Sequence, residues 1–184
     1  MHYPRLDKAI LLAARLHAGA ERDGDAPLPY VTHPIEVLIA LRFEGGETDE
    51  DLLCGAALHD TLEDTNAKRE ALAAEVGERA ADLVRELTRE EPTEEKRKGL
   101  DKEAIWRLRA EMLLDEIRAM SPDAQKIKLA DRLINLRDAR RTKSGFKWDR
   151  YAWQTEEILK IVPEGRNPGL WRAIRVELDA GKAA

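Results

Sequence analysis

The sequence has little cysteine, few aromatic residues and no long apolar run, and each shortage excludes a class of protein. Its single cysteine, Cys54, cannot form an internal disulfide, and its leucine and alanine neighbours favour a buried apolar role over a reactive thiol. Glycine and proline number only 11 and 8, which excludes a fibrous or low-complexity chain. No apolar run reaches membrane-spanning length and no signal-peptide pattern opens the chain, so we expect a soluble, cytoplasmic protein without a membrane partner.

The residues that are abundant favour helices. Leucine, alanine, arginine, glutamate and lysine dominate, whereas β-branched and aromatic residues are sparse. A length of 184 residues fits one domain, 1–184, large enough to bury a continuous core. A net charge of −5 argues against a nucleic-acid partner, so an anionic ligand would need a local cluster of basic residues. We therefore predict an all-α, single-domain protein of roughly eight to ten helices, whose oligomeric state stays open.

Apolar spacing and capping residues set the expected helix boundaries. Residues 20–30 read as a loop, and residues 89–103 as an exposed, charged connection, for which a solvated linker is favoured over a lid. Thr48 is expected to cap the third helix, Thr65 or Asn66 the fourth, and Ser121 the long helix that follows Pro122. The expected helices span residues 6–22, 34–41, 50–64, 66–77, 78–88, 104–120, 123–141, 148–161 and 168–180.

Polar side chains interrupt two apolar helix faces. At about 100° per residue, His59, Asp60 and Glu63 share one side of the expected helix 50–64, with Asp64 at its margin. Asp131 lies inside the apolar stripe of the long helix. Burying an unpaired carboxylate costs several kcal/mol, so Asp131 requires a cation or strong hydrogen-bond donors beside it.

Two imidazoles and two carboxylates fall on three segments that can converge. Singly, a helical histidine is usually a hydrogen-bonded structural residue, and an aspartate near an apolar stripe usually pairs with arginine. Together they form a mixed nitrogen and oxygen set that suits manganese, iron or zinc. The candidate ligands are His33, His59, Asp60 and Asp131.

Further polar residues lie one helical turn from these candidates. Glu63 and Asp64 are ordinary surface acids in the simplest interpretation, but beside a metal they would orient and deprotonate a water. Lys128 and Asn135 share a helix face with Asp131. Lys128 could meet a phosphate and Asn135 a sugar, although a salt bridge or a cap explains either one alone.

Three motifs, PYVTHP, LHDTLEDT and KLADRLINL, occur in this order. Their sequence resembles the hydrolase domain of the RelA/SpoT alarmone enzymes, in particular the small alarmone hydrolases of the HD-domain superfamily. The resemblance covers residues 17–160 and is weak across residues 89–120. It implies an all-α HD-domain bundle that hydrolyses the 3′-pyrophosphate of (p)ppGpp, yielding GDP or GTP and pyrophosphate.

The resemblance also implies a role for each motif residue. One Mn²⁺ would be held by the four candidate ligands, with iron or zinc as alternatives. Glu63 and Asp64 would form the catalytic acidic pair, and Asn135 would contact the nucleotide. With Arg22, Lys128 and Tyr151, Asn135 completes the expected substrate-binding set.

Two departures from the family pattern bear on the substrate. The family's Arg-Lys pair before PYVTHP reads Arg22-Asp23 here, so an adenosine alarmone, (p)ppApp, stays open beside the guanosine one. A family tyrosine falls on Gln154, for which Tyr151, one turn earlier, is the expected substitute. Two alternatives remain: an HD phosphatase acting on deoxynucleotides or NADPH, and a non-catalytic nucleotide-binding module.

Overall fold

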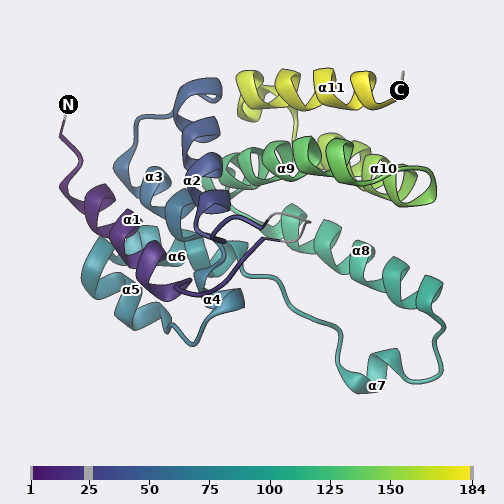
Figure 1. The fold of residues 1–184 in the computed structure, drawn as a ribbon, viewed down its shortest axis with the longest axis horizontal. Helices are drawn as coiled ribbons and strands as arrows, with labels where there is room; N and C mark the ends of the chain where they lie inside the picture. Colours follow the sequence, from purple (N-terminus) through teal and green to yellow (C-terminus); the bar gives the residue numbers. More distant parts are fainter. Residues whose placement is uncertain (1, 23–26, 183–184) are drawn as a thin grey trace.

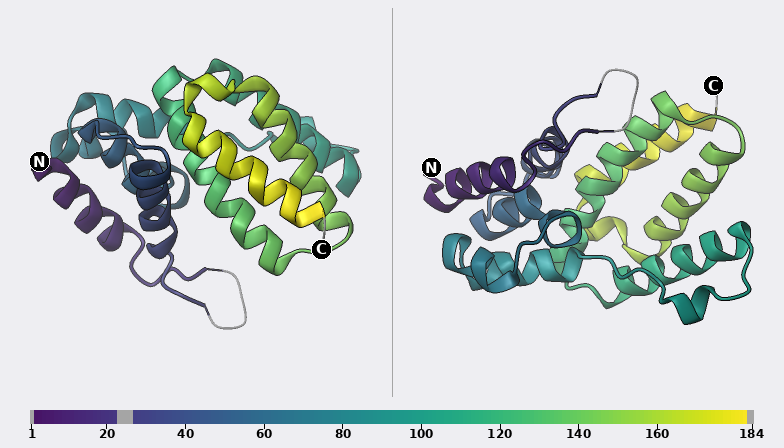
Figure 2. Two further views of the ribbon diagram at one scale, coloured as in Figure 1. Left: turned by 90° about the horizontal axis from the view of Figure 1, so that it is seen from above. Right: turned by 60° about the horizontal axis from the view of Figure 1, so that its bottom comes forward.

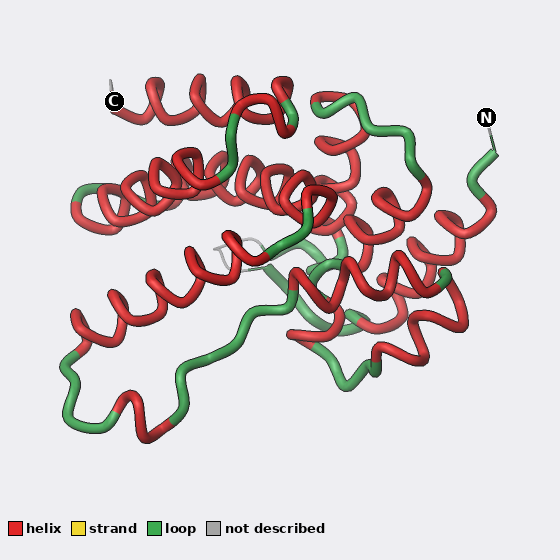
Figure 3. The backbone as a smooth tube through the Cα atoms, turned by 180° about the vertical axis from the view of Figure 1, so that it is seen from behind, coloured by secondary structure: helices red, strands yellow, loops and turns green. Residues whose placement is uncertain are grey.

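Helices account for nearly all the regular structure in the computed structural model (Figures 1 and 3), which confirms the all-α prediction. The structure describes residues 2–22 and 27–182, and within these ranges there is no strand, only an isolated antiparallel bridge between Glu21 and Pro29. A π-helical turn, Ala40–Glu44, continues α2, and a 3₁₀ turn, Glu164–Arg166, precedes the last helix. The α-helices are α1 Pro4–Leu16, α2 Thr32–Ile39, α3 Glu50–Leu58, α4 Thr61–Asp64, α5 Arg69–Val76, α6 Glu78–Leu87, α7 Glu94–Arg97, α8 Lys102–Ala119, α9 Pro122–Thr142, α10 Phe146–Ile161 and α11 Pro168–Lys182.

The long helix α9 joins the two halves of the molecule. It contacts α2, α3 and α6 on one side and α10 and α11 on the other. Figure 1 shows α1 to α6 in one half, and Figure 2 shows α11 running beside α9. One hydrophobic cluster passes through this contact, with Leu58 of α3 and Leu133 of α9 among its fully buried members. Any polar residue on the inward face of α9 therefore lies at the centre of the fold.

Local hydrogen bonds set the helix ends, not always where the sequence suggests. Ser121 accepts a hydrogen bond from the Ala124 amide and caps α9 as predicted. The cap of α3 is Asp49, which accepts from the Asp51 amide, so the prediction of Thr48 is wrong. Helix α5 begins only at Arg69, and Lys68 at its N-cap makes no side-chain hydrogen bond, so the prediction of Thr65 or Asn66 as the cap is wrong. The Thr65 hydroxyl instead accepts a hydrogen bond from the Ala67 amide, in the loop before α5.

The expected helix 50–64 is broken, which corrects the sequence analysis. Helix α3 ends at Leu58, and α4 begins at Thr61. The Thr61 hydroxyl donates a hydrogen bond to the Leu58 carbonyl oxygen at 2.6 Å. In a continuous helix this oxygen would accept from a backbone amide one turn later, so the side chain competes with the helical hydrogen bond. His59 and Asp60 thus lie in the connecting turn, and the common-face argument does not extend across it.

The charged connection 89–103 leaves the body of the molecule and returns as α8 (Figure 1). Its side chains are mostly exposed, Pro92 is buried, and the single turn α7 lies within it. Among the described residues, no helix has both the length and the apolar character needed to cross a membrane.

Candidate metal centre and active-site cleft

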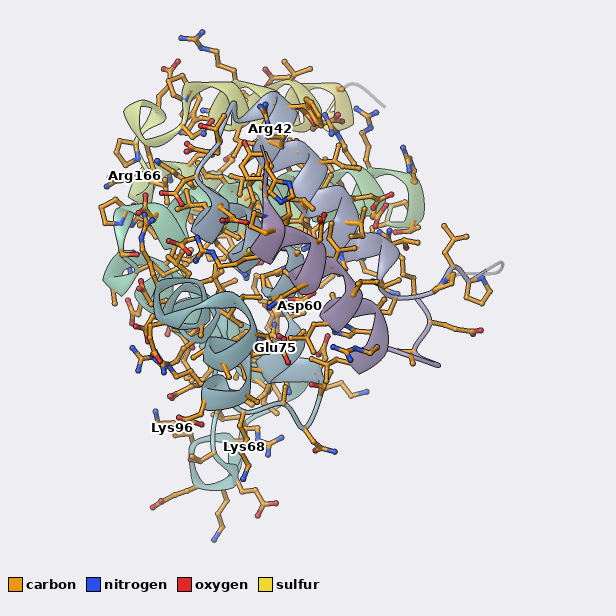
Figure 4. All side chains as sticks on the ribbon, turned by 90° about the vertical axis from the view of Figure 1, so that its left-hand side faces the viewer. Arg42, Asp60, Lys68, Glu75, Lys96 and Arg166 are labelled. Atoms are coloured by element: carbon orange, nitrogen blue, oxygen red, sulfur yellow. The ribbon has the colours of Figure 1, made fainter. Side chains whose placement is uncertain are left out.

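Three elements bring the four candidate metal ligands together. The first turn of α2 carries His33, the break between α3 and α4 carries His59 and Asp60, and α9 carries Asp131. His33, His59 and Asp131 are buried, and Asp60 is half-buried. Figure 4 labels Asp60 near the middle of that view. The four residues are called the metal-ligand cluster below.

The ligand atoms of the cluster converge on one point. One ligand atom each from His33, His59 and Asp60 lies within 4.8 Å of the others. The Nε2 atoms of the two histidines lie 3.4 Å and 3.7 Å from Oδ1 of Asp131. Oδ2 of Asp60 is 3.6 Å from Nε2 of His33. Such a group of imidazoles and carboxylates has the composition of a divalent-metal site.

His59 presents a nitrogen suited to a metal. Its Nδ1 lies 2.9 Å from the Ala56 carbonyl oxygen, which can only accept, so Nδ1 carries a proton. Its Nε2 is buried without a hydrogen-bond partner, although Oδ1 of Asp60 is 2.9 Å away, because the two are poorly aligned. A buried imidazole nitrogen that faces two carboxylates without a hydrogen-bond partner is suited to bind a cation.

The surroundings of the cluster keep its two carboxylates ionised. Burial works against the charged form of His59, but the carboxylates of Asp60 and Asp131 raise its pKa to about 10. Burial likewise opposes ionisation of Asp60, yet the adjacent His59 and the nearby His33 lower its pKa to about 2. Despite its burial, Asp131 has a pKa well below the usual range because of Lys128 and the two histidines. Both carboxylates are therefore ionised and attract a cation.

Neighbouring side chains orient the two carboxylates. The Tyr30 hydroxyl donates to Oδ2 of Asp60 at 2.7 Å, and burial with the nearby acids raises the Tyr30 pKa, so the hydroxyl keeps its proton. Nζ of Lys128 lies 2.9 Å from Oδ2 of Asp131, and the Asn135 amide donates to Oδ1. Tyr30 belongs to the PYVTHP motif, but no role was predicted for it from the sequence. Lys128 and Asn135, predicted to contact the substrate, here hold Asp131.

A cleft of about 760 Å³ opens beside the metal-ligand cluster. Three cluster members, Asp131 among them, line it, while His59 lies behind the surface. Glu63 lines the cleft, whereas the exposed Asp64 does not. The structure therefore brings Glu63 to the cleft and leaves Asp64 at its edge. The lining also includes all four predicted substrate-binding residues, Arg22, Lys128, Asn135 and Tyr151.

Arg22 lines the end of the cleft beside the last turns of α9. Its guanidinium donates to Glu36 at 2.7 Å and to Asp138. Asp23, the acid that replaces the family's lysine, lies outside the described residues. Arg22 is therefore the described member of the expected base-binding pair.

Tyr151 and Gln154 both face the cleft from α10. The Arg132 guanidinium lies 4.7 Å from the centre of the Tyr151 ring and donates to Oε1 of Gln154 at 3.0 Å. Burial raises the pKa of Tyr151 to about 12. Arg132 thus contacts both Gln154, which stands at the position of the family tyrosine, and Tyr151, its expected substitute.

The cleft is also lined by residues that were not predicted to bind the substrate. They include Arg89, at the start of the charged connection, and Trp106 and Arg109 of α8. Oε1 of Glu63 accepts a hydrogen bond from Arg89 at 2.8 Å. The sequence shows only that the connection 89–103 is dense in charges of both signs, and this pattern predicted exposure to solvent.

The sequence and the fold both match known proteins. A family model described as "HD domain" matches residues 9–161. Guanosine-3′,5′-bis(diphosphate) 3′-pyrophosphohydrolase MESH1 of Drosophila melanogaster is 37% identical over 168 residues, covering 89% of this chain and 87% of that protein. The human MESH1 is 34% identical over 175 residues, covering 93% and 91%. A GTP pyrophosphokinase, rsh of Brucella abortus, is 33% identical, and the match covers 92% of this chain but 24% of that protein.

A solved structure shows the same arrangement of helices. It is described as a metazoan ortholog of SpoT that hydrolyzes ppGpp and plays a role in starvation responses. The TM-score is 0.81 at 30% identity, and the match covers 98% of each chain. The chain therefore belongs to the HD-domain family and, within it, to the small alarmone hydrolases related to MESH1.

Proposed function

We propose that the chain is a Mn²⁺-dependent 3′-pyrophosphohydrolase that converts (p)ppGpp to GDP or GTP and pyrophosphate. The observation that carries the proposal is the convergence of imidazole and carboxylate ligand atoms within 4.8 Å beside a cleft lined by basic side chains. The names of its MESH1 relatives describe a 3′-pyrophosphohydrolase of guanosine-3′,5′-bis(diphosphate). Metal chemistry and a polyanion-binding cleft together support hydrolysis of a phosphorylated nucleotide.

An HD domain implies a divalent metal, and His33, His59, Asp60 and Asp131 would hold it. Manganese is proposed because the set mixes nitrogen and oxygen donors, with iron or zinc as alternatives. When bound, a divalent cation lowers the pKa of a coordinated water and offsets phosphate charge. Tyr30 fixes the orientation of the Asp60 carboxylate by donating a hydrogen bond to it.

Glu63 is proposed as the group that takes the proton of the attacking water. It lines the cleft one turn after Asp60. The water oxygen forms a bond to the phosphorus attached to the ribose 3′ oxygen, the phosphorus–O3′ bond breaks, and O3′ takes a proton. Asp64 is proposed as the second member of the acidic pair, acting from the edge of the cleft beside Tyr30.

Arg22, Asn135 and Tyr151 are proposed to contact the nucleotide, and Lys128 the phosphate beside Asp131. Arg22 carries a planar guanidinium that can stack on a base. Lys128 and Asn135 both hold Asp131, so each would couple substrate contact to the metal-ligand cluster. These contacts do not separate guanine from adenine, so ppApp belongs in any test.

A substrate panel tests the proposal. Purified protein with Mn²⁺ is incubated separately with ppGpp, ppApp, deoxynucleoside triphosphates and NADPH, and released pyrophosphate and phosphate are measured. Release of pyrophosphate from ppGpp is the expected result. Turnover of deoxynucleotides or NADPH alone would indicate an HD phosphatase of another class. A protein that binds no metal and turns over nothing would indicate a binding module.

A further inference from the structure

Arg89 forms hydrogen bonds to Glu63, the carboxylate proposed to accept the proton of the attacking water. Its Nη2 lies 2.8 Å from Oε1 of Glu63, and its backbone amide donates to Oε2 at 3.3 Å. Arg89 comes from the segment between α6 and α8, in the region where the family resemblance is weak. A residue outside the recognised motifs therefore makes direct contact with a proposed catalytic group.

A second arginine is held beside the first through Glu91. Nη2 of Arg109 lies 2.7 Å from Oε2 of Glu91, and Nη2 of Arg89 lies 3.8 Å from Oε1 of the same carboxylate. Arg89 and Arg109 both line the cleft, whereas Glu91 is not part of its lining. Glu91 thus stands behind the two guanidinium groups and sets their spacing.

Both arginines keep hydrogen-bond donors for a ligand. A guanidinium has five N–H donors, and a carboxylate on one edge leaves the others available. Glu91 takes the Nε and one Nη2 donor of Arg109, and Glu63 takes one Nη2 donor of Arg89. The two side chains are 44% and 47% exposed, so an anion in the cleft can reach them. Paired guanidinium groups match the oxygens of a phosphate chain.

This arginine pair lies apart from the basic group at the other end of the cleft. Arg22 pairs with Asp138, which follows Asp131 by two turns of α9, roughly 10 Å along the axis at 1.5 Å per residue. Arg89 lies on the other side of Asp131 along α9, because its neighbour Glu90 donates a backbone hydrogen bond at 3.1 Å to the half-buried Glu116, whose carboxylate also interacts with Lys128. The metal-ligand cluster therefore has a cationic region on either side.

We infer that Arg89 and Arg109 bind the pyrophosphate group that is cut from the substrate. The inference rests on the proposed function, because it assigns one end of the same cleft to the leaving group. The incoming phosphate oxygens replace Glu63 as the partner of Arg89, which frees the Glu63 carboxylate to accept a proton. Arg109, held by Glu91, contacts the outer phosphate. The Arg22 end then receives the nucleoside.

Product inhibition tests the assignment. Inhibition constants for pyrophosphate and for GDP are measured against ppGpp hydrolysis in the wild type, R89A, R109A and the control R107A. Arg107 lies on the same helix as Arg109, pairs with Glu103, is 69% exposed and does not line the cleft. Pyrophosphate binds divalent cations in solution, but the same metal concentration for every variant removes this effect from the comparison.

The expected result is a rise of about tenfold or more in the pyrophosphate constant for R89A and R109A. The GDP constant should stay within about twofold, and R107A should leave both constants unchanged. R89K should recover part of the loss, which a purely structural role would not require. Unchanged pyrophosphate constants in R89A and R109A, or an equal rise in the GDP constant, would overturn the inference.

A direct binding measurement separates this inference from the proposed function. Inorganic pyrophosphate is titrated calorimetrically into the metal-loaded wild type, R89A, R109A and R107A, with thermal unfolding as the check on folding. If the wild type hydrolyses no alarmone, the proposed function fails, and the titration still decides the subsite. Weaker binding by R89A and R109A than by R107A supports it, and equal binding by all variants overturns it.

Discussion

The backbone of Ala56 orients the imidazole of His59, which follows it by three residues: the Ala56 carbonyl oxygen lies 2.9 Å from Nδ1 of His59. The carbonyl holds the ring so that Nε2 faces Asp60 and Asp131. A backbone group within the same turn thus decides which nitrogen is offered to a metal.

The first prediction concerns metal content. H59A should retain less than about a tenth of the wild-type metal after dialysis, because losing a residue that merely orients a ligand already weakens metal affinity by about 10- to 100-fold, and losing the ligand itself costs at least as much. His17 is a matched control, since it is also buried and its Nδ1 contacts a backbone carbonyl at 3.0 Å, but it lies outside the metal-ligand cluster. H17A should keep its metal. Elemental analysis that finds equal metal in H59A and the wild type would contradict this role.

Metal removal should destabilise the protein. Asp60 is half-buried and Asp131 is buried, and a cation relieves the repulsion between their two carboxylates. A metal at a hundred times its dissociation constant adds about 2.7 kcal/mol, which corresponds to about 5 to 10 °C in Tm for a chain of this size. Thermal unfolding with and without a chelator measures the shift. D131N should lose most of this shift, and a wild-type Tm that ignores the chelator would refute metal binding.

The acidic pair should contribute unequally. E63Q should lower kcat by about a hundredfold or more while metal content stays the same, because the amide cannot accept the water proton. D64N should have the smaller effect, because Asp64 is not part of the cleft lining. Glu70 of α5, an exposed acid outside the cleft lining, provides the control E70Q. An E63Q protein with full turnover would remove Glu63 from the mechanism.

Cys54 should be unreactive in the folded protein. Its side chain is fully buried, and burial raises its pKa to about 12. At pH 8 an alkylating reagent should modify it only after denaturant is added, because the neutral thiol is a poor nucleophile. The thiol ionises above about pH 8.5 in the unfolded chain but stays neutral in the folded chain. The free energy of unfolding should therefore fall as the pH rises above about 8.5. Mass spectrometry follows the modification, and rapid labelling of native protein would contradict the burial.

Local chemistry made much of the fold predictable. The Ser121-Pro122 cap marks the start of α9, and the all-α class follows from composition. The break between α3 and α4, which contains His59 and Asp60, was not predictable from periodicity, because it depends on a hydrogen bond from the Thr61 hydroxyl to the Leu58 carbonyl oxygen. Single-domain organisation and a cytoplasmic location stay predictions.

The part of the candidate site that lies within the sequence motifs could be predicted. His33, His59 and Asp60 were named from sequence, and the structure brings their ligand atoms together. Arg89 and Arg109 were missed because their partners lie 26 and 18 residues away in the sequence. Charge in the connecting segment that holds Arg89, and on an exposed helix such as the one that holds Arg109, normally indicates solvent. Only the folded chain shows that this charge faces the cleft.

The products formed from ppGpp test the central claim most directly. The purified protein is supplied with Mn²⁺ and ppGpp, and the nucleotide and phosphate products are separated and quantified over time. We predict GDP and pyrophosphate in equal amounts, with turnover stopped by a chelator and restored by Mn²⁺. Single phosphate as the product, or intact ppGpp after prolonged incubation with metal, would contradict a 3′-pyrophosphohydrolase.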